Sequence, residues 1–113
     1  MRIMLKSKIH RARVTSTNLF YEGSISIDEE LMKKANIIEG EKVEVLNLNN
    51  GSRTETYAIK GKEGEICLNG PAARTGMVGD EVIILAYAIV PEEKVNLFKP
   101  KIVYVDEYNR IKT

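Results

Sequence analysis

A serine that directly follows a glycine, at Gly23-Ser24, is a pair of residues whose types could do chemistry on the chain itself. A serine hydroxyl can attack the carbonyl carbon of the preceding residue when a turn bends that carbonyl towards it. Glycine helps, because it adopts backbone angles closed to other residues and leaves the attack unobstructed. The product would be an ester, elimination would break the chain, and hydrolysis of the resulting dehydroalanine would leave a pyruvoyl group. The same dipeptide is also a common turn, and alone it leaves both interpretations open.

A basic stretch near the N-terminus is a second candidate, with Arg2, Lys6, Lys8, His10, Arg11 and Arg13. On a strand, Lys6, Lys8 and His10 share one face, where they could bind an anion such as a small carboxylate. The stretch could also be a solvated strand edge or a nucleic-acid-binding arm. It has no interleaved aromatic residues and the chain has no basic excess, so nucleic acid is not the expected partner.

The segment "RTETY", residues 53–57, contains side chains suited to a carboxylate ligand. Arg53 could grip a carboxylate with two parallel hydrogen bonds, and Tyr57 could give or take a proton. A regular strand places both on one face and Thr54 and Thr56 on the other. Ordinary cross-strand packing is the alternative.

The segment "LNGPAA", residues 68–73, places the amide of Asn69 beside small residues. Such a loop lets a ligand approach the backbone closely, with N–H groups free to bind an anion. A plain turn would explain the same composition.

Length and composition indicate one ordinary globular domain, since the chain has 113 residues, 43% of them hydrophobic and 29% charged. The formal net charge is only +1, which favours no polyanionic partner. Cys67 is the only cysteine, so we expect a small buried hydrophobe, no disulfide and no metal site. There is neither an apolar run of membrane-spanning length nor the hydrophobic centre of a secretory signal, and we expect a cytoplasmic protein without a membrane partner.

Short runs of Val, Ile, Thr and Tyr between Gly, Asn and Pro favour strands over helices. We expect one or two strands within residues 3–21 and further strands over 42–48, 53–59, 65–70, 79–90 and 101–108. The run 79–90 is apolar enough for a central, doubly buried strand. Asn50-Gly51 predicts a hairpin, and the tail 109–113 is expected to fray.

The best predicted helix covers residues 26–36, with Ser26 as its N-cap and Asn36 closing it in a left-handed conformation. A second short helix is expected over 91–98 after Pro91. About seven short strands with one or two short helices favour a closed small β-barrel over a layered α/β fold.

Taken in order along the chain, these segments resemble a known family. "MLKSKIHRARVT", "YEGSISID", "NGSRTETYAI", "LNGPAA" and "VGDEVIILAYA" together are similar to the pyruvoyl-dependent aspartate 1-decarboxylases, from about Met4 through the last strand. The resemblance implies a mainly β fold, a six-stranded double-psi β-barrel with one or two short helices. It also implies a homotetramer with active sites between neighbouring subunits.

The same resemblance implies a proenzyme that cuts itself between Gly23 and Ser24. The products would be a short chain, 1–23, and a long chain, 24–113, whose pyruvoyl cofactor is made from Ser24. The enzyme would be a carboxy-lyase that converts L-aspartate to β-alanine and carbon dioxide for pantothenate and coenzyme A synthesis. The substrate amine would form an imine with the pyruvoyl ketone, which accepts the electrons left by the departing carboxylate. Whether the cut needs a helper protein stays open.

Residue roles follow by position in the matching motifs. Thr56 matches the family's self-processing threonine, Tyr57 the proton donor, and Lys8 and Arg53 the residues that bind substrate carboxylate. The other matching pocket positions are Tyr21, His10, Asn69, Gly70, Ala72 and Ala73. This sequence departs from the family at Pro71, which removes a backbone donor from the substrate loop, and at Ile25.

Thr56 and Tyr57 pose a geometric difficulty, because neighbours on a regular strand face opposite sides. We expect either a bulge here or a Thr56 that acts on the Gly23 carbonyl from another side. Two other hypotheses stay open at this point. One is an uncut β-barrel that binds a partner or nucleic acid in a salt-sensitive way, and the other is the same barrel and cut with a different amino acid as substrate.

Overall fold

The computed structural model describes residues 1–112 and is mainly β, as the sequence predicts. Its strands are β1 (Arg2–Arg13), β2 (Ser16–Asn18), β3 (Ser24–Asp28), β4 (Lys42–Asn47), β5 (Arg53–Gly61), β6 (Ile66–Asn69), β7 (Glu81–Val90) and β8 (Lys101–Tyr104). The helices within these residues are α1 (Glu29–Ala35) and two short 3₁₀ helices, η1 (Gly70–Arg74) and η2 (Glu92–Leu97). None of them is long and apolar enough to cross a membrane.

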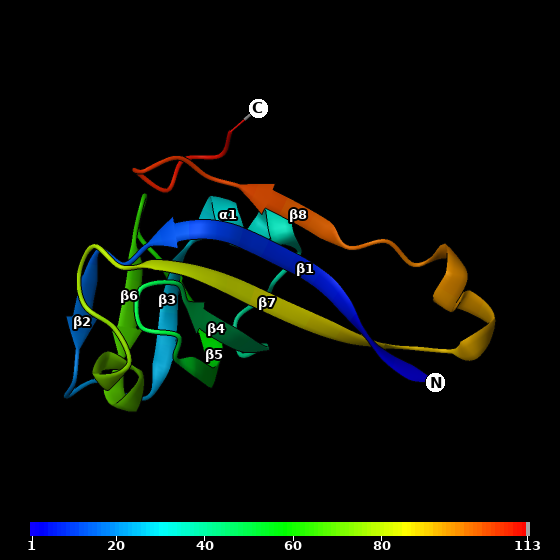
Figure 1. Ribbon diagram of the computed structural model, residues 1–113, viewed down its shortest axis with the longest axis horizontal. Coiled ribbons are helices and arrows are strands. Elements are labelled where there is room, and N and C mark those ends of the chain that lie inside the picture. The colour runs from blue at the N-terminus through cyan, green and yellow to red at the C-terminus, as the bar shows by residue number, and fades with distance from the viewer. Residues whose placement is uncertain (113) are drawn as a thin grey trace.

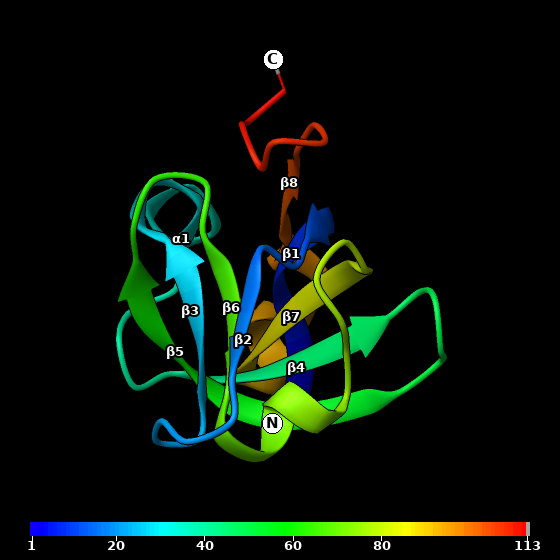
Figure 2. The ribbon, with the colours of Figure 1, turned by 90° about the vertical axis from the view of Figure 1, so that its left-hand side faces the viewer.

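The strands form one sheet in the order β2-β6-β3-β5-β4-β7-β1-β8, and Figure 2 shows this sheet curling around the core. Three neighbouring pairs are parallel, β2 with β6, β3 with β5 and β1 with β8, and the others are antiparallel. Six inner strands are thus flanked by the short strands β2 and β8. This curled, mainly β sheet confirms the predicted fold class.

One hydrophobic cluster fills the inside of the curled sheet. Its largest members alternate along the strands and come from β1, β3, β4, β6, β7 and α1: Ile9, Ile25, Ile27, Leu31, Val43, Ile66, Leu68, Val82 and Ile84. Each such side chain contributes about 1.5–3 kcal/mol when it leaves water. Helix α1 packs against β1, β3 and β8 and so closes one side of the core (Figure 1).

Helix α1 starts later than predicted, and its N-cap is Asp28 rather than Ser26. The Asp28 carboxylate accepts hydrogen bonds from the backbone N–H groups of Glu30 and Leu31. Ser26 cannot serve as the cap because β3 stays paired with both β5 and β6 beyond it. The predicted helix end is confirmed, with Asn36 in the left-handed region at φ 57°.

The ends of β1 and β7 project from the rounded body as a two-stranded ribbon (Figure 1). The predicted double burial of residues 79–90 is therefore correct only where β7 lies between β1 and β4. There Val82 and Ile84 are buried, whereas Tyr87 and Ile89, which follow the last β4–β7 pair at Leu85, are exposed.

Residues 109–112 are held in place, so the prediction of a frayed tail is wrong for them, and Thr113 lies outside the described residues. The buried amide of Asn109 donates to the carbonyls of Arg13 and Gly64, both at 2.9 Å, and accepts from the Arg13 N–H at 2.7 Å. The Lys112 N–H donates to the Tyr104 carbonyl. The polar composition of the tail could not reveal the hydrogen bonds of Asn109, because they join residues that are far apart in the sequence.

Candidate functional site

The Gly23–Ser24 peptide lies where an exposed loop enters the sheet. Tyr21 and Glu22 are exposed, Gly23 is half-buried, and Ser24, the first residue of β3, has no exposed surface. The Ser24 hydroxyl donates to the Glu22 carbonyl at 3.0 Å. This hydrogen bond spans Gly23, whose carbonyl carbon the hydroxyl would have to attack. The nucleophile is thus shielded from bulk water and close to its own backbone.

Asn69 is brought next to Ser24 by the antiparallel pairing of β3 and β6, which places the two residues opposite each other. Its amide Nδ2 donates to Ser24 Oγ at 3.0 Å, and both side chains are buried. A donor at this oxygen favours the negative charge that develops when the hydroxyl proton leaves.

Gly70 and Pro71 pack against the backbone of the loop before Ser24. Gly70 has φ 63°, and a Cβ on it would lie 2.8 Å from Gly23 Cα and 3.0 Å from the Tyr21 carbonyl oxygen. Only glycine permits this approach. Pro71 is the second residue of the 3₁₀ helix η1, in which Ala72 is buried and Ala73 half-buried. The structure therefore gathers the predicted loop residues around the Gly23–Ser24 peptide.

Strand β5 runs beside β3, and its register brings Thr56 and Tyr57 to the same level as the peptide. Ile25 lies opposite Ala58, so continuing the parallel register places Tyr57 level with Ser24 and Thr56 level with Gly23. Thr56 is half-buried and Tyr57 is 38% exposed. The β4–β5 ladder is regular here, so the predicted bulge is wrong and the two side chains face opposite sides.

Arg53 stands on the same exposed face of β5 as Tyr57. Its guanidinium lies 3.6 Å from the Glu44 carboxylate, which also accepts a hydrogen bond from the Tyr87 hydroxyl at 2.8 Å. Burial, and after it the hydrogen bond to Glu44, raises the pKa of Tyr87. Glu44 and Tyr87 were not predicted as site residues, because only the register of β4 with β5 and β7 brings them to Arg53.

Lys8 and His10 lie on β1, which three strands separate from β3 in the sheet order. Within residues 1–112, Lys8 is the one lysine or arginine of β1 without an ion pair, whereas Lys6 is paired with Glu41. The His10 ring packs edge-on against Tyr104, with ring centres 5.7 Å apart. The sheet therefore does not pair these two predicted residues with the strand of Ser24.

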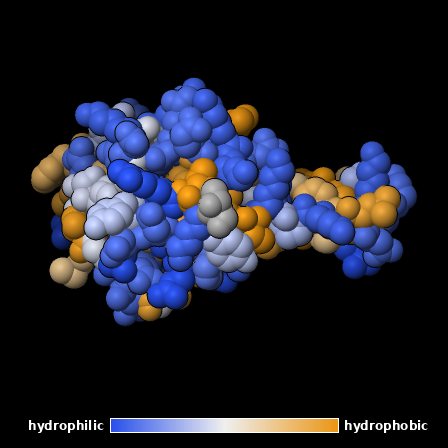
Figure 3. All heavy atoms as spheres, turned by 90° about the horizontal axis from the view of Figure 1, so that it is seen from above, coloured by the Kyte–Doolittle hydropathy of each residue, from blue (hydrophilic) through white to orange (hydrophobic). Residues whose placement is uncertain are grey.

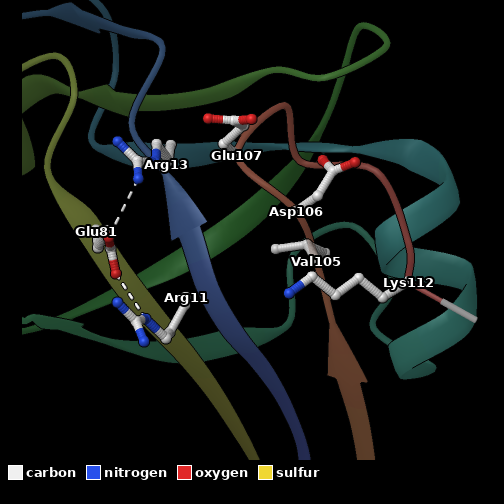
Figure 4. Close-up of a pocket in the computed structure, with 7 residues that line it drawn as sticks. All are labelled: Arg11, Arg13, Glu81, Val105, Asp106, Glu107 and Lys112. Atoms are coloured by element: carbon white, nitrogen blue, oxygen red, sulfur yellow. Dashed lines mark hydrogen bonds and ion pairs between the residues drawn. The ribbon is translucent and has the colours of Figure 1, made fainter.

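A separate charged cleft lies between β1, β7 and the C-terminal segment (Figure 4). Arg11 and Arg13 both contact Glu81, at 2.7 and 3.3 Å, and the hydrogen bond from Arg11 is the main cause that lowers the pKa of Glu81. The remaining lining residues are Val105, Asp106, Glu107 and Lys112. Positive and negative side chains balance here, and none of the residues around Gly23–Ser24 contributes to the cleft.

Ser26 and Cys67 also belong to the surroundings of Asn69, although the sequence analysis gave them other roles. The Asn69 amide donates to Ser26 Oγ at 3.0 Å, and the Cys67 thiol donates to Asn69 Oδ1 at 3.2 Å. The sequence held one indication of this grouping, because residues two apart on a strand lie on the same face. Ser24 therefore shares a face of its strand with Ser26, and Cys67 shares a face of its strand with Asn69. No group of three or more His, Cys, Asp or Glu residues suited to a metal occurs in the described part of the chain.

Comparison with known proteins gives a consistent result over almost the whole chain. A family model described as aspartate decarboxylase matches residues 1–112. The aspartate 1-decarboxylase of Campylobacter concisus is 62% identical over 108 residues, covering 96% of this chain and 94% of the relative. Those of Caldicellulosiruptor saccharolyticus and Desulfitobacterium hafniense are 60% and 59% identical over 110 residues, covering 96% of this chain and 86% and 87% of the relatives.

Proposed function

We propose that this chain, which belongs to the aspartate decarboxylase family, makes its own cofactor at Ser24 and builds its active site around the Gly23–Ser24 peptide. The reaction is the decarboxylation of L-aspartate to β-alanine, a step that serves pantothenate synthesis. This biosynthetic role supports a location in the cytoplasm. The observation that carries the proposal is the buried Ser24 hydroxyl, held by Asn69 directly after a half-buried glycine.

Self-processing starts at the Ser24 hydroxyl. Its oxygen bonds to the Gly23 carbonyl carbon, the bond from that carbon to the Ser24 nitrogen breaks, and the hydroxyl proton moves to the nitrogen. Loss of the Ser24 α-proton then breaks the bond between Cβ and the ester oxygen, which frees the Gly23 carboxylate and leaves dehydroalanine. Water converts this residue to a pyruvoyl group and releases ammonia. The short chain 1–23 and the long chain 24–113 result.

Thr56 is the proposed donor that stabilises the oxyanion during the first of these steps. Two observations support this role: Thr56 is level with Gly23 in the β3–β5 register, and its side chain is half-buried. A hydrogen-bond donor stabilises an oxyanion more strongly when the site is shielded from water. Tyr57 faces the other side of β5 and is proposed to act after the cut, as the proton donor to the substrate α-carbon.

A pyruvoyl group at residue 24 would supply the electron sink that no ordinary side chain provides. The surroundings fit a small planar group, because the Asn69 Nδ2 is already directed at the Ser24 oxygen and Gly70 has no side chain to crowd the adjoining Gly23 backbone. Arg53 and Lys8 are proposed to bind the two carboxylates of aspartate, with Arg53 supplying directional selectivity. Tyr21, His10, Ala72 and Ala73 complete the proposed pocket.

The positions of Lys8 and His10 support the proposed homotetramer with active sites between subunits. They lie on β1, away from the strand of Ser24, and Lys8 is unpaired within the described chain, so a neighbouring copy is the proposed source of these two residues. The projecting ribbon and its neighbours expose the apolar side chains of Ile3, Tyr87, Ile89 and Leu97. Figure 3 shows hydrophobic side chains, in orange, on the surface of this projection. Exposed apolar patches of this kind mark protein interfaces.

Replacement of Ser24 by alanine tests the proposal, with Ser16→Ala, at a half-buried serine of strand β2, as a matched control. We expect Ser24→Ala to stay a single chain of 113 residues on a denaturing gel and to release no carbon dioxide from L-aspartate. Ser16→Ala should be cut and active like the wild type. Cleavage or activity in Ser24→Ala would contradict the proposal, and a panel of amino acids would show whether L-aspartate is the preferred substrate.

A further inference from the structure

Four buried polar side chains form a compact group on the face shared by β3 and β6. The antiparallel register places Ser24 opposite Asn69 and Ser26 opposite Cys67. All four are nearly or fully buried, with exposed fractions of 0% for Ser24, 2% for Asn69, 8% for Ser26 and 6% for Cys67. Buried polar groups are costly unless they are hydrogen-bonded, so the pattern of bonds among them is tightly constrained.

The Asn69 amide is the centre of this group. Its Oδ1 accepts from the Cys67 thiol at 3.2 Å, and its Nδ2 donates to Ser24 Oγ and Ser26 Oγ, each at 3.0 Å. The Ser24 hydroxyl donates a hydrogen bond to the Glu22 carbonyl. Each of the two amide hydrogens has its own serine oxygen, and the amide oxygen has the thiol.

We propose that Cys67 is a positioning residue for the self-processing of Ser24, acting through the orientation of the Asn69 amide. This inference rests on the proposed function, because it concerns the rate of the cut. The thiol holds the amide oxygen away from Ser24, and as a result the amide nitrogen faces the Ser24 oxygen. No metal or other ligand is needed for this role.

The orientation matters because an amide side chain can turn by half a rotation and exchange its donor for its acceptor. With Nδ2 towards Ser24, the hydroxyl oxygen receives a hydrogen bond that becomes stronger as the oxygen loses its proton at the start of the attack. With Oδ1 towards Ser24, the same oxygen would meet a second acceptor and lose that stabilisation. A donor at residue 67 favours the first state, since Oδ1 is the only atom of the amide that can accept its hydrogen.

The required property of residue 67 is therefore a small side chain with a donor hydrogen, which serine also has. Alanine keeps the small size but removes the donor. Loss of the net stabilisation of one such hydrogen bond corresponds to a cleavage rate that is lower by a factor of about five to ten. We expect Cys67→Ala to slow the conversion of precursor to two chains by about this factor and Cys67→Ser to restore the rate to within about twofold of wild type.

The experiment is a pulse of cell-free synthesis of the full chain followed by a chase, with the precursor and the two products separated on a denaturing gel. It includes wild type, Cys67→Ala, Cys67→Ser, Asn69→Ala and the double variant Cys67→Ala/Asn69→Ala. In the Asn69→Ala background, removal of the thiol should not change the rate further, because the amide on which it acts is gone. Each substitution is also made in the Ser24→Ala background, in which the chain stays uncut. The thermal unfolding temperatures of these variants then show whether a substitution changes the stability of the fold.

Three results would overturn the inference while wild-type cleavage is normal. These are Cys67→Ala processing at the wild-type rate, Cys67→Ser being as slow as Cys67→Ala, and Cys67→Ala slowing the cut equally with and without the Asn69 amide. The last result would mean that Cys67 acts through packing alone. A wild-type chain that is never cut would instead contradict the proposed function itself, so the two failures are distinguishable.

Discussion

Thr56 and Tyr57 are adjacent residues, but they face different surroundings and are proposed to act at different times. Thr56 is half-buried and level with Gly23, whereas Tyr57 is 38% exposed on the face that also carries Arg53. This division follows from the period of two along β5. On the proposed roles, this division separates the making of the cofactor from its use, so single substitutions should affect one step and not the other.

Tyr57→Phe should give a chain that is cut normally but turns over slowly. Loss of a positioned proton donor typically costs at least about 100-fold, and we expect kcat for L-aspartate to fall by about that factor with little change in KM. Tyr108→Phe is the matched control, because Tyr108 is 68% exposed and lies outside the site. An uncut Tyr57→Phe chain, or one with wild-type kcat, would contradict the role of this residue.

At the scale of elements, Asp28 joins the strand that carries Ser24 to the helix that closes the core. Its carboxylate accepts from the N–H groups of Glu30 and Leu31 at the start of α1 and from that of Gly64 at 2.6 Å. Asp28 is 7% exposed, so these bonds are shielded from water. The C-terminal end of β3 is therefore fixed from two sides.

Asp28→Ala should lower the free energy of unfolding by about 2 kcal/mol, because it removes an N-cap worth about 1 kcal/mol and leaves the Gly64 N–H without its acceptor. Glu29→Ala is the control, since the exposed Glu29 makes only a helical ion pair with Lys33 and should change stability by about 0.5 kcal/mol or less. Urea unfolding in the Ser24→Ala background measures both. Equal losses for the two variants would show that the Asp28 contacts contribute little.

Local patterns predicted most of these elements. Alternation along 42–48 and 53–59 and the turn at Asn50-Gly51 correspond to β4, β5 and their hairpin. The helix start was misplaced because Ser26 and Asp28 are both good capping residues. What decides between them is the pairing of β3 with β5 and β6, which joins residues far apart in sequence.

The site was predictable to a similar extent. The motif order predicted Gly23, Ser24 and Asn69 as site residues, and the structure places them side by side. The hydrogen bond between Ser24 and Asn69 depends on a strand register that a single sequence does not reveal. The same register places the Cys67 thiol against the Asn69 amide and underlies the positioning role that we propose for it. Polarity alone could not distinguish a buried thiol that donates to an amide from one that only fills space.

At the scale of the whole molecule, the proposed pocket is divided between distant parts of one chain. Ser24 and its partners lie on β3, β5 and β6, while Lys8 and His10 lie on β1, next to the projecting ribbon. An assembly in which one copy supplies Ser24 and its neighbour supplies Lys8 explains this arrangement. It also gives the exposed apolar residues of the ribbon a partner.

Mixed assemblies test this division directly. Lys8→Ala and Ser24→Ala should each be inactive alone, but their co-expression at equal levels should restore about a quarter of wild-type activity, because some sites then combine an intact Ser24 with an intact Lys8. Carbon dioxide release by the purified mixture is the measurement. If the mixture is no more active than the single variants, Lys8 and Ser24 do not meet between copies.

The most direct test of self-processing is the intact mass of freshly purified, active wild-type protein. We expect two chains that correspond to residues 1–23 and 24–113, the longer being about 17 Da lighter than a fragment that starts with serine, since a ketone replaces the amine. One unbroken chain with an ordinary serine at position 24 in an active preparation would contradict the formation of the cofactor from Ser24.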